Sequence, residues 1–320
     1  SGVIAVDRKN RVIIINPYAK KIFGITKDII GQNLLDNIRN FELENILHQS
    51  GDDYKEIKIV WPKERELRIK TADIINMSEH IGTVAVVQDI TEVKNLENMR
   101  TQFVANVSHE LKTPLTSIRG FAETLKYVDD AATKEKFLNI INEEAERLTR
   151  LITDILTLSK IEQQKEVKQG KIDVNKIVKD VYNLMKNTAD LKGIQLSIEQ
   201  EKIKILIGDA DRFKQMLINL VDNAINYSEI GNNVSIGTES HDDKFILWVK
   251  DTGVGIAKEQ IPRLFERFYR VDKARSRSKG GTGLGLAIVK HIVLEFNGKI
   301  YVESKLEIGS KFIVEIPYNK

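Results

Sequence analysis

The sequence Ser108-His109-Glu110-Leu111-Lys112-Thr113-Pro114-Leu115 lies in a long stretch whose apolar residues recur at helical spacing. A histidine on such a helix has no structural advantage over Leu or Gln. Its neighbours, however, suit a reactive imidazole. Glu110 can hydrogen-bond the ring and fix which nitrogen is nucleophilic, and Thr113 follows at i+4 on the same face. Pro114 cannot donate to the Glu110 carbonyl, which favours a kinked or loosened backbone. We therefore predict a reactive histidine beside a mobile point of the helix.

The overall composition is that of a globular protein with two or three domains. The chain has 320 residues, of which 42% are hydrophobic and 30% charged, with a net charge of +3. This charge is too small to indicate a nucleic-acid partner. The absence of cysteine excludes disulfides, Cys-ligated zinc and a cysteine nucleophile.

No apolar run approaches the roughly 20 residues of a membrane-spanning helix. The first residues, Ser1-Gly2, lack an initiator Met and resemble a cloning scar. We expect a cytoplasmic location, which the lack of cysteine fits. Because the first residues resemble those of a fragment, the missing membrane segment says little about the native protein.

Residues 1–90 are predicted to form a small α+β domain. Strands are expected at 3–6 and 11–16, followed by a helix over 17–24 that has Pro near its start and Gly at its end. Further strands are expected at 55–60, 66–74 and 80–89. This pattern resembles a PAS sensor domain. A dimerising module without a ligand is an equally open interpretation, and the sequence identifies no PAS ligand.

Residues 91–163 are predicted to form a helical hairpin. The first helix has a coiled-coil seam that consists of Val93, Leu96, Met99 or Arg100, Phe103, Val107 and Leu111. A polar break at 129–133 precedes a second amphipathic helix with the apolar series Phe137, Ile141, Ala145, Leu148, Ile152 and Ile155. One hairpin cannot bury these stripes alone, whereas two hairpins can bury them in a four-helix bundle. We therefore predict a homodimer.

Residues 171–320 are predicted to form an α/β sandwich with one layer of each kind, after a polar linker over 163–170. Helices are expected over 173–191, over 211–227 with Asp211 as cap, and over 283–297. Strands are expected at 194–199, 203–207, 234–238, 245–250, 299–304 and 310–316.

Two stretches of this domain suggest a ligand site. Asn219 and Asn223 are four residues apart on one helix face, although Asn is a poor helix former. Amide oxygens are ligands that Mg²⁺ accepts. Asp251-Thr252-Gly253-Val254-Gly255 follows an apolar strand, where a carboxylate can accept a hydrogen bond from an exocyclic amine such as that of adenine. Its glycines permit close backbone approach. Taken separately, solvated asparagines and a surface turn would explain these stretches better.

Two further stretches suggest an anion site. Phe265-Glu266-Arg267-Phe268-Tyr269-Arg270 interleaves aromatic and basic residues, as a lid over phosphates would. The basic run around it also contains Arg263, Lys273, Arg275, Arg277 and Lys279. The sequence Gly280-Gly281-Thr282-Gly283-Leu284-Gly285 opens a helix, whose N-terminal amides attract anions. The spacing is not that of a dinucleotide fold, and no P-loop or protein-kinase signature is present.

Together these stretches resemble the sensor histidine kinases of two-component signalling over roughly residues 90–320. Residues 109–115 resemble the H-box, 219–227 the N-box, 251–255 the G1 box, 265–269 the F-box and 281–285 the G2 box. The resemblance implies a Bergerat-type ATP-binding fold with ATP and Mg²⁺ as cofactors. Asn223 would ligate the metal, Asp251 would bind the adenine amine, and Arg270 would meet the phosphates. The full set of implied nucleotide-binding residues is Asn219, Asn223, Tyr227, Asp251, Gly253, Gly255, Arg267, Arg270, Thr282, Gly283, Leu284 and Gly285.

The resemblance also implies the chemistry. His109 would attack the γ-phosphoryl group of ATP, with Glu110 as base or orienting group, and the partner accepting the phosphoryl group would be an aspartate of a response-regulator receiver domain. Thr113 would position the water of a phosphatase reaction on that regulator. The family often has Lys three residues after the metal-binding Asn, but this chain has Asn226. We expect a weakened phosphate contact there without loss of activity.

Sensor kinases of this class that have PAS domains are usually membrane-anchored. The resemblance therefore implies that this chain is the cytosolic part of a membrane-anchored sensor kinase, and that any membrane contact uses segments absent from this chain.

Two other functions remain open at this point. The ATP fold alone would also serve a conformational ATPase, although the helix containing His109 argues against it. A non-catalytic scaffold that acts through the PAS-like dimer would bind no nucleotide.

Overall fold

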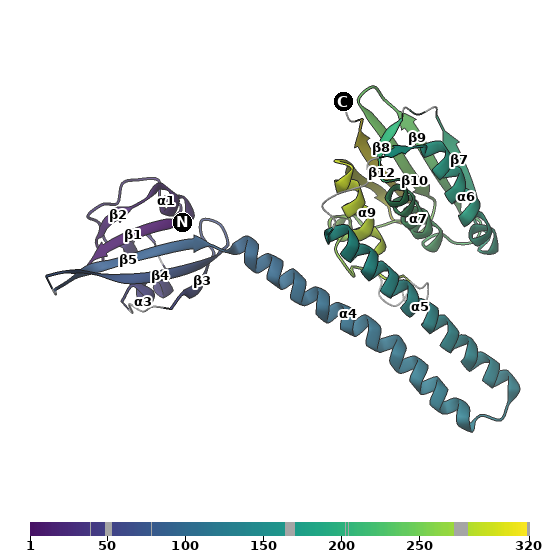
Figure 1. The fold of residues 1–320 in the computed structure, drawn as a ribbon, viewed down its shortest axis with the longest axis horizontal. Helices are drawn as coiled ribbons and strands as arrows, with labels where there is room; N and C mark the ends of the chain where they lie inside the picture. Colours follow the sequence, from purple (N-terminus) through teal and green to yellow (C-terminus); the bar gives the residue numbers. More distant parts are fainter. Residues whose placement is uncertain are drawn as a thin grey trace. The chain divides into compact units, whose positions relative to one another are not determined.

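The computed structural model describes residues 1–38, 40–48, 53–77, 79–163, 170–201, 203, 205–271 and 281–318. They divide into two compact units, Ser1–Ala105 and Asn106–Lys320 (Figure 1). Most of the predicted linker, the basic residues from Lys273 to Lys279, and Gly280 lie outside the described residues. In the described part of the chain, no helix combines the length and apolarity needed to cross a membrane.

The N-terminal unit contains a five-stranded antiparallel sheet in the order β2-β1-β5-β4-β3. The strands are β1 (Gly2–Asp7), β2 (Val12–Ile15), β3 (Lys55–Ile59), β4 (Arg65–Asn76) and β5 (Glu79–Asp89). The helices are α1 (Pro17–Phe23), α2 (Leu34–Asn37) and α3 (Phe41–His48). Alternate strand residues, such as Ile4, Ile69 and Val87, are buried in one core with α1 and α3. The predicted strands of this domain are therefore confirmed.

Helix α1 follows the predicted start and stop signals. The Oδ1 of Asn16 accepts a hydrogen bond from the backbone N–H of Ala19 at 2.9 Å, and Pro17 occupies the first turn. Gly24 ends the helix in the left-handed conformation, with φ of 66°.

Two long helices form the hairpin. Helix α4 (Thr91–Thr124) continues through Pro114 and ends in a 3₁₀ turn, Leu125–Tyr127. Helix α5 (Ala131–Gln163) follows, and the Phe121 and Phe137 rings of the two helices lie 5.0 Å apart. Pro114 therefore does not end the helix. Apolar seam residues remain exposed within this one chain, namely Val93, Leu96, Met99 and Ile152.

The C-terminal domain is an α/β sandwich, as predicted. Its sheet has the order β11-β12-β10-β9-β7, in which only the β7–β9 pair among the described strands is parallel. The strands are β7 (Gln195–Gln200), β9 (Asn233–Ser240), β10 (Lys244–Asp251), β11 (Lys299–Lys305) and β12 (Gly309–Pro317). Helices α6 (Val174–Leu191), α7 (Ala210–Asn226) and α9 (Gly285–Glu295) pack against this sheet (Figure 1). A 3₁₀ helix, Lys258–Arg263, follows β10.

The structure corrects three details of the predicted boundaries. Strands β6 (Gly170–Ile172) and β8 (Leu206–Gly208) pair in a small separate sheet. Asp209, and not Asp211, caps α7, because the Asp209 Oδ1 accepts from the N–H groups of Asp211 and Arg212. Helix α9 is shorter than predicted, since Gly283 and Asn297 have positive φ and cannot extend a right-handed helix.

Phe213 on α7 is the centre of the sandwich core. Its side chain is fully buried, and its ring lies 6.0 Å from that of Phe245 and 6.1 Å from that of Phe296. Aromatic contacts at these distances add to the free energy of burial.

We predict that Phe213→Ala lowers the unfolding free energy of the C-terminal domain by about 3–5 kcal/mol, because it leaves a cavity between two aromatic rings. Urea unfolding followed by the fluorescence of the buried Trp248 measures the change. Phe41→Ala is the matched control, since Phe41 is 83% exposed and belongs to the N-terminal unit. Equal unfolding free energies for the wild type and Phe213→Ala would contradict this description of the core.

Candidate functional site

Of the two predicted asparagines on α7, Asn219 contacts the start of α9. The Asn219 Nδ2 donates to the Gly285 carbonyl at 3.3 Å, and its Oδ1 accepts from Gln215 at 3.0 Å. Within the described residues, the side-chain amide of Asn223 has no hydrogen-bond partner. Asn223 follows Asn219 by one helical turn, and an amide oxygen there is of the kind that Mg²⁺ accepts together with phosphates.

A buried carboxylate lies at the end of β10. Asp251 is 4% exposed, and its Oδ1 accepts from the N–H groups of Gly253 at 2.9 Å and Ser310 at 3.2 Å. Burial raises the pKa of the carboxyl above its usual value, against the lowering effect of these two hydrogen bonds. Because Oδ1 is used by the loop, Oδ2 remains to accept a hydrogen bond from a ligand amine.

Glycines bring the loop after β10 close to its neighbours. A Cβ on Gly253 would lie 2.3 Å from the carbonyl oxygen of Tyr227 and 3.1 Å from the Asp251 Oδ1, so Gly253 packs between these two residues. Gly255 has φ of 67°, and a Cβ there would lie 2.1 Å from the Lys305 carbonyl oxygen. Larger residues cannot replace either glycine without moving the backbone.

The segment before α9 is fixed by backbone contacts. The Phe268 N–H donates to the Gly283 carbonyl at 2.8 Å, and the Leu284 N–H donates to the Thr282 hydroxyl at 3.3 Å. Gly283 has φ of 73°. Thr282, Gly283, Leu284 and Gly285 therefore lead directly into the N-terminus of α9, where free N–H groups favour an anion.

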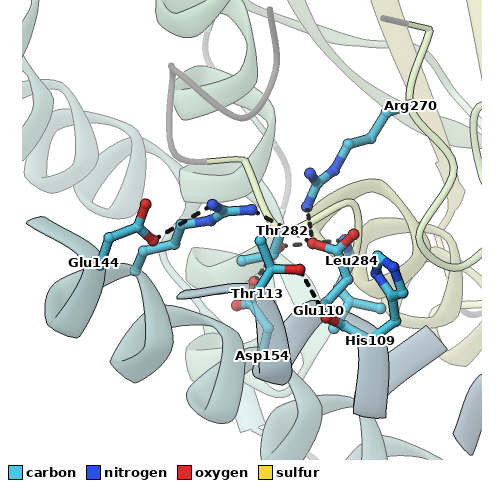
Figure 2. Close-up of polar contacts among 9 residues, drawn as sticks. His109, Glu110, Thr113, Glu144, Asp154, Arg270, Thr282 and Leu284 are labelled. Atoms are coloured by element: carbon cyan, nitrogen blue, oxygen red, sulfur yellow. Dashed lines mark hydrogen bonds and ion pairs between the residues drawn. The ribbon is translucent and has the colours of Figure 1, made fainter. Parts of the chain in front are cut away.

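Two of the predicted phosphate-binding side chains contact carboxylates of the helical hairpin (Figure 2). The Thr282 hydroxyl donates to the Asp154 Oδ2 of α5 at 2.6 Å. Arg270 Nη2 donates to the Glu110 Oε2 of α4 at 3.3 Å, and Arg147 Nη2 of α5 donates to the same oxygen at 3.4 Å. The Arg270 side chain is only 5% exposed, so this ion pair lies in a largely desolvated place.

Arg267 makes a third contact with the hairpin. It forms an ion pair with Glu162 at the end of α5, and His291 Nε2 of α9 lies 3.4 Å from the Glu162 Oε1. The resemblance predicted a nucleotide contact for Arg267, whereas in this structure it joins α5 to the C-terminal domain.

His109 is exposed on α4, next to Glu110 (Figure 2). The Thr113 hydroxyl donates to the His109 carbonyl at 3.2 Å, which places it one turn along the same face. The Glu110 carboxylate points to the two arginines. Both arginines bond its Oε2.

The contact of Asp154 on α5 with the C-terminal domain has a pH dependence. Desolvation by burial raises the pKa of Asp154 above its usual value, the hydrogen bond from Thr282 opposes this rise, and the negative charge of Asp222 on α7 adds to it. The pKa of the Asp154 carboxyl is thus higher when α5 contacts the C-terminal domain than when the two are apart, so the contacting state binds this proton more tightly. The contact is therefore strongest at low pH and weakens as pH rises through this raised pKa.

Sequence reasoning missed Arg147, Asp154 and Glu162, because charged residues on an amphipathic helix are normally solvated. Arg147 and Asp154 are seven residues apart, which places them on one face beside the apolar seam. This spacing indicates that the two side chains share one face of α5, but it does not identify the residues that they contact.

Comparisons with known proteins match both parts of this site. Residues 99–164 match the family model "His Kinase A (phospho-acceptor) domain". Residues 208–320 match "Histidine kinase-, DNA gyrase B-, and HSP90-like ATPase".

Curated relatives cover nearly the whole chain. A sensor protein kinase WalK of Staphylococcus aureus is 35% identical over 333 residues, which cover 99% of this chain and 78% of the relative. WalK of Staphylococcus aureus strain Newman is also 35% identical, over 99% of this chain and 53% of the relative. The chain thus spans about half the length of that protein.

Solved structures show the same fold. The histidine kinase ThkA, in complex with the response regulator protein TrrA, aligns with a TM-score of 0.58 at 26% identity, over 100% of this chain and 96% of that chain. AdeS of Acinetobacter baumannii aligns with a TM-score of 0.54 at 30% identity, over 66% of this chain and 98% of that chain. With the geometry above, these similarities establish that the chain belongs to the sensor histidine kinases of two-component systems.

Proposed function

We propose that this chain is an ATP- and Mg²⁺-dependent histidine kinase that phosphorylates His109 and transfers the phosphoryl group to an aspartate of a response regulator. The observation that supports this most directly is the contact of Arg270 with Glu110, the neighbour of His109. A cation of the nucleotide-binding domain thereby lies beside the residue that would accept the phosphoryl group.

The nucleotide would extend along α7 from Asp251 to the start of α9. Asp251 Oδ2 would accept a hydrogen bond from the adenine amine beside Tyr227 and Gly253. Asn223 would ligate Mg²⁺, supported by Asn219. The bound metal would neutralise part of the phosphate charge. Thr282, the amides of Gly283 and Gly285, and Arg270 would bind the terminal phosphates.

ATP would compete with the hairpin for these groups. Thr282 and Arg270 are bonded to Asp154 and Glu110 in the structure, so the phosphates would have to replace two carboxylates. Such an exchange releases Arg270 from Glu110, and the freed carboxylate can then turn to the His109 imidazole. Nucleotide binding would therefore loosen the contact between the two parts and prepare the acceptor.

In the reaction, a ring nitrogen of His109 attacks the γ-phosphorus in line. The N–P bond forms as the bond from phosphorus to the ADP oxygen breaks. Glu110 accepts a hydrogen bond from, or the proton of, the other ring nitrogen. Arg270 stabilises charge on the transferred oxygens, so positioning and electrostatics do most of the catalysis.

The proposal includes a partner and a second copy. ThkA has been solved in complex with a response regulator, and we infer a receiver domain as the partner of this chain. Thr113 would position water in a phosphatase reaction on that partner. The exposed seam of α4 and α5 supports a homodimer through a four-helix bundle. The five-stranded N-terminal sheet supports a PAS-like sensor domain.

His109→Gln should abolish acid-labile labelling of the protein by γ-labelled ATP and Mg²⁺, because Gln has no nucleophilic ring nitrogen. Filter retention of label, before and after acid treatment, measures this. His241→Gln is the control, since His241 is an exposed histidine after β9 and should leave labelling unchanged. Persistent labelling of His109→Gln would refute the assignment. Release of phosphate without any labelled wild-type protein would favour a conformational ATPase.

Asp154 offers a test of the competition between hairpin and nucleotide. Asp154→Ala removes the acceptor of the Thr282 hydroxyl and should tighten binding of a non-hydrolysable ATP analogue about threefold to tenfold. Asp154→Asn keeps an acceptor oxygen and removes a desolvated charge, so it should not tighten binding. Calorimetric titration of the full chain measures both affinities.

Asp180→Ala is the matched control, because Asp180 is exposed on α6. An Asp154→Ala protein with wild-type affinity would show that the carboxylate does not compete with nucleotide.

A further inference from the structure

A lysine from another element lies at the position where Asn226 replaces the lysine of the family pattern. The Lys192 Nζ donates to the Asn226 Oδ1 at 2.5 Å, although the two residues are 34 positions apart. Asn226 Nδ2 in turn donates to the Asp222 Oδ2 at 3.0 Å. The N-box face of α7 therefore has a cation at this point, contributed by the end of α6.

The backbone of Lys192 is held in place. It ends α6, where its N–H donates to the Ala189 carbonyl at 3.0 Å, and Gly193 follows with φ of 66°. The Gly193 carbonyl accepts from the Gly231 N–H at 2.9 Å, in the turn that follows α7. The ends of α6 and α7 are thus joined through backbone hydrogen bonds, which brings the Lys192 side chain to α7.

A carboxylate lies near Lys192. Desolvation raises the pKa of Asp222, and the positive charges of Lys192 and of Arg150 on α5 oppose this rise. Asp222 as a whole residue remains exposed, so the group is reachable from solvent. Of these two cations, Lys192 belongs to the C-terminal domain itself and stays when the hairpin moves away.

Position along the helix indicates what the ammonium would meet. Asn219 and Asn226 are seven residues apart, which is two turns and about 10 Å on one face. Asn219 lies at the N-terminus of α9, whereas Asn226 precedes Tyr227, which contacts the Asp251 loop. A nucleotide lying between these ends has its nucleoside next to Asn226 and its terminal phosphate next to α9.

We propose that Lys192 binds the phosphates nearest the nucleoside, in place of the lysine that position 226 lacks. This assignment rests on the proposed nucleotide site and specifies one of its ligands. Asn226 then orients the ammonium through its amide oxygen. The sequence analysis expects a weakened phosphate contact at Asn226, and Lys192 would offset that weakening.

A purely structural role of Lys192 predicts different effects on ligand binding from those of a phosphate contact. If Lys192 only tied α6 to α7, its loss would lower the melting temperature and weaken every ligand of the site equally. A phosphate contact affects ligands that carry phosphates and spares adenosine.

The experiment measures binding of ADP, a non-hydrolysable ATP analogue and adenosine to the full chain, by calorimetry for the nucleotides and NMR titration for adenosine. Lys192→Met should weaken both nucleotides about tenfold and leave adenosine unchanged. Adding Asn226→Lys to Lys192→Met should restore nucleotide affinity to within about threefold of the wild type, because it returns an ammonium to the same face. Lys179→Met, an exposed lysine of α6, is the matched control.

The proposal would be overturned by any of three results. Lys192→Met could bind nucleotides as tightly as the wild type, or it could lose affinity for adenosine and for nucleotides equally. The third result is a double variant with Asn226→Lys that does not regain nucleotide affinity. A wild-type chain that binds no nucleotide would instead contradict the proposed function on which the assignment rests.

Discussion

The structure of the site depends on one carboxylate oxygen that accepts two guanidinium groups. Glu110 Oε2 receives Arg270 from the nucleotide-binding domain and Arg147 from the other helix of the hairpin. All three side chains are largely withdrawn from solvent, and removing one member would leave a desolvated charge without compensation. This ion-pair cluster couples the segment that contains His109 to the groups expected to bind ATP phosphates.

The proposed function divides the site between two parts of the chain. The proposed acceptor, His109, is on an exposed helix, and the proposed ATP site consists of α7, the loop after β10 and the start of α9. Carboxylates of the hairpin use the same donors that phosphates would use. Under the proposed function the contact would compete with nucleotide, and any motion of α4 that shifts Glu110 would change the balance between the two.

Local patterns in the sequence predicted most of the fold. The period of two in β1 and β5, the Pro and Gly at the ends of α1, and the heptad-like stripes of α4 and α5 depend on neighbouring residues only. Boundaries failed where backbone geometry decided, as at Gly283, or where the cap was one of two nearby aspartates. The contacts of Thr282 with Asp154, 128 residues apart, and of Asn226 with Lys192 could not be predicted, because helical spacing fixes a face but not its partner.

Hydrogen–deuterium exchange of the full chain with and without a non-hydrolysable ATP analogue and Mg²⁺ tests the competition between hairpin carboxylates and nucleotide most directly. The account predicts that peptides covering 251–255 and 284–289 gain protection. Peptides of α5 that contain Asp154 should lose protection, because the contact of Asp154 with Thr282 of the C-terminal domain opens. Gain of protection in the nucleotide site together with unchanged or increased protection around Asp154 would contradict the account.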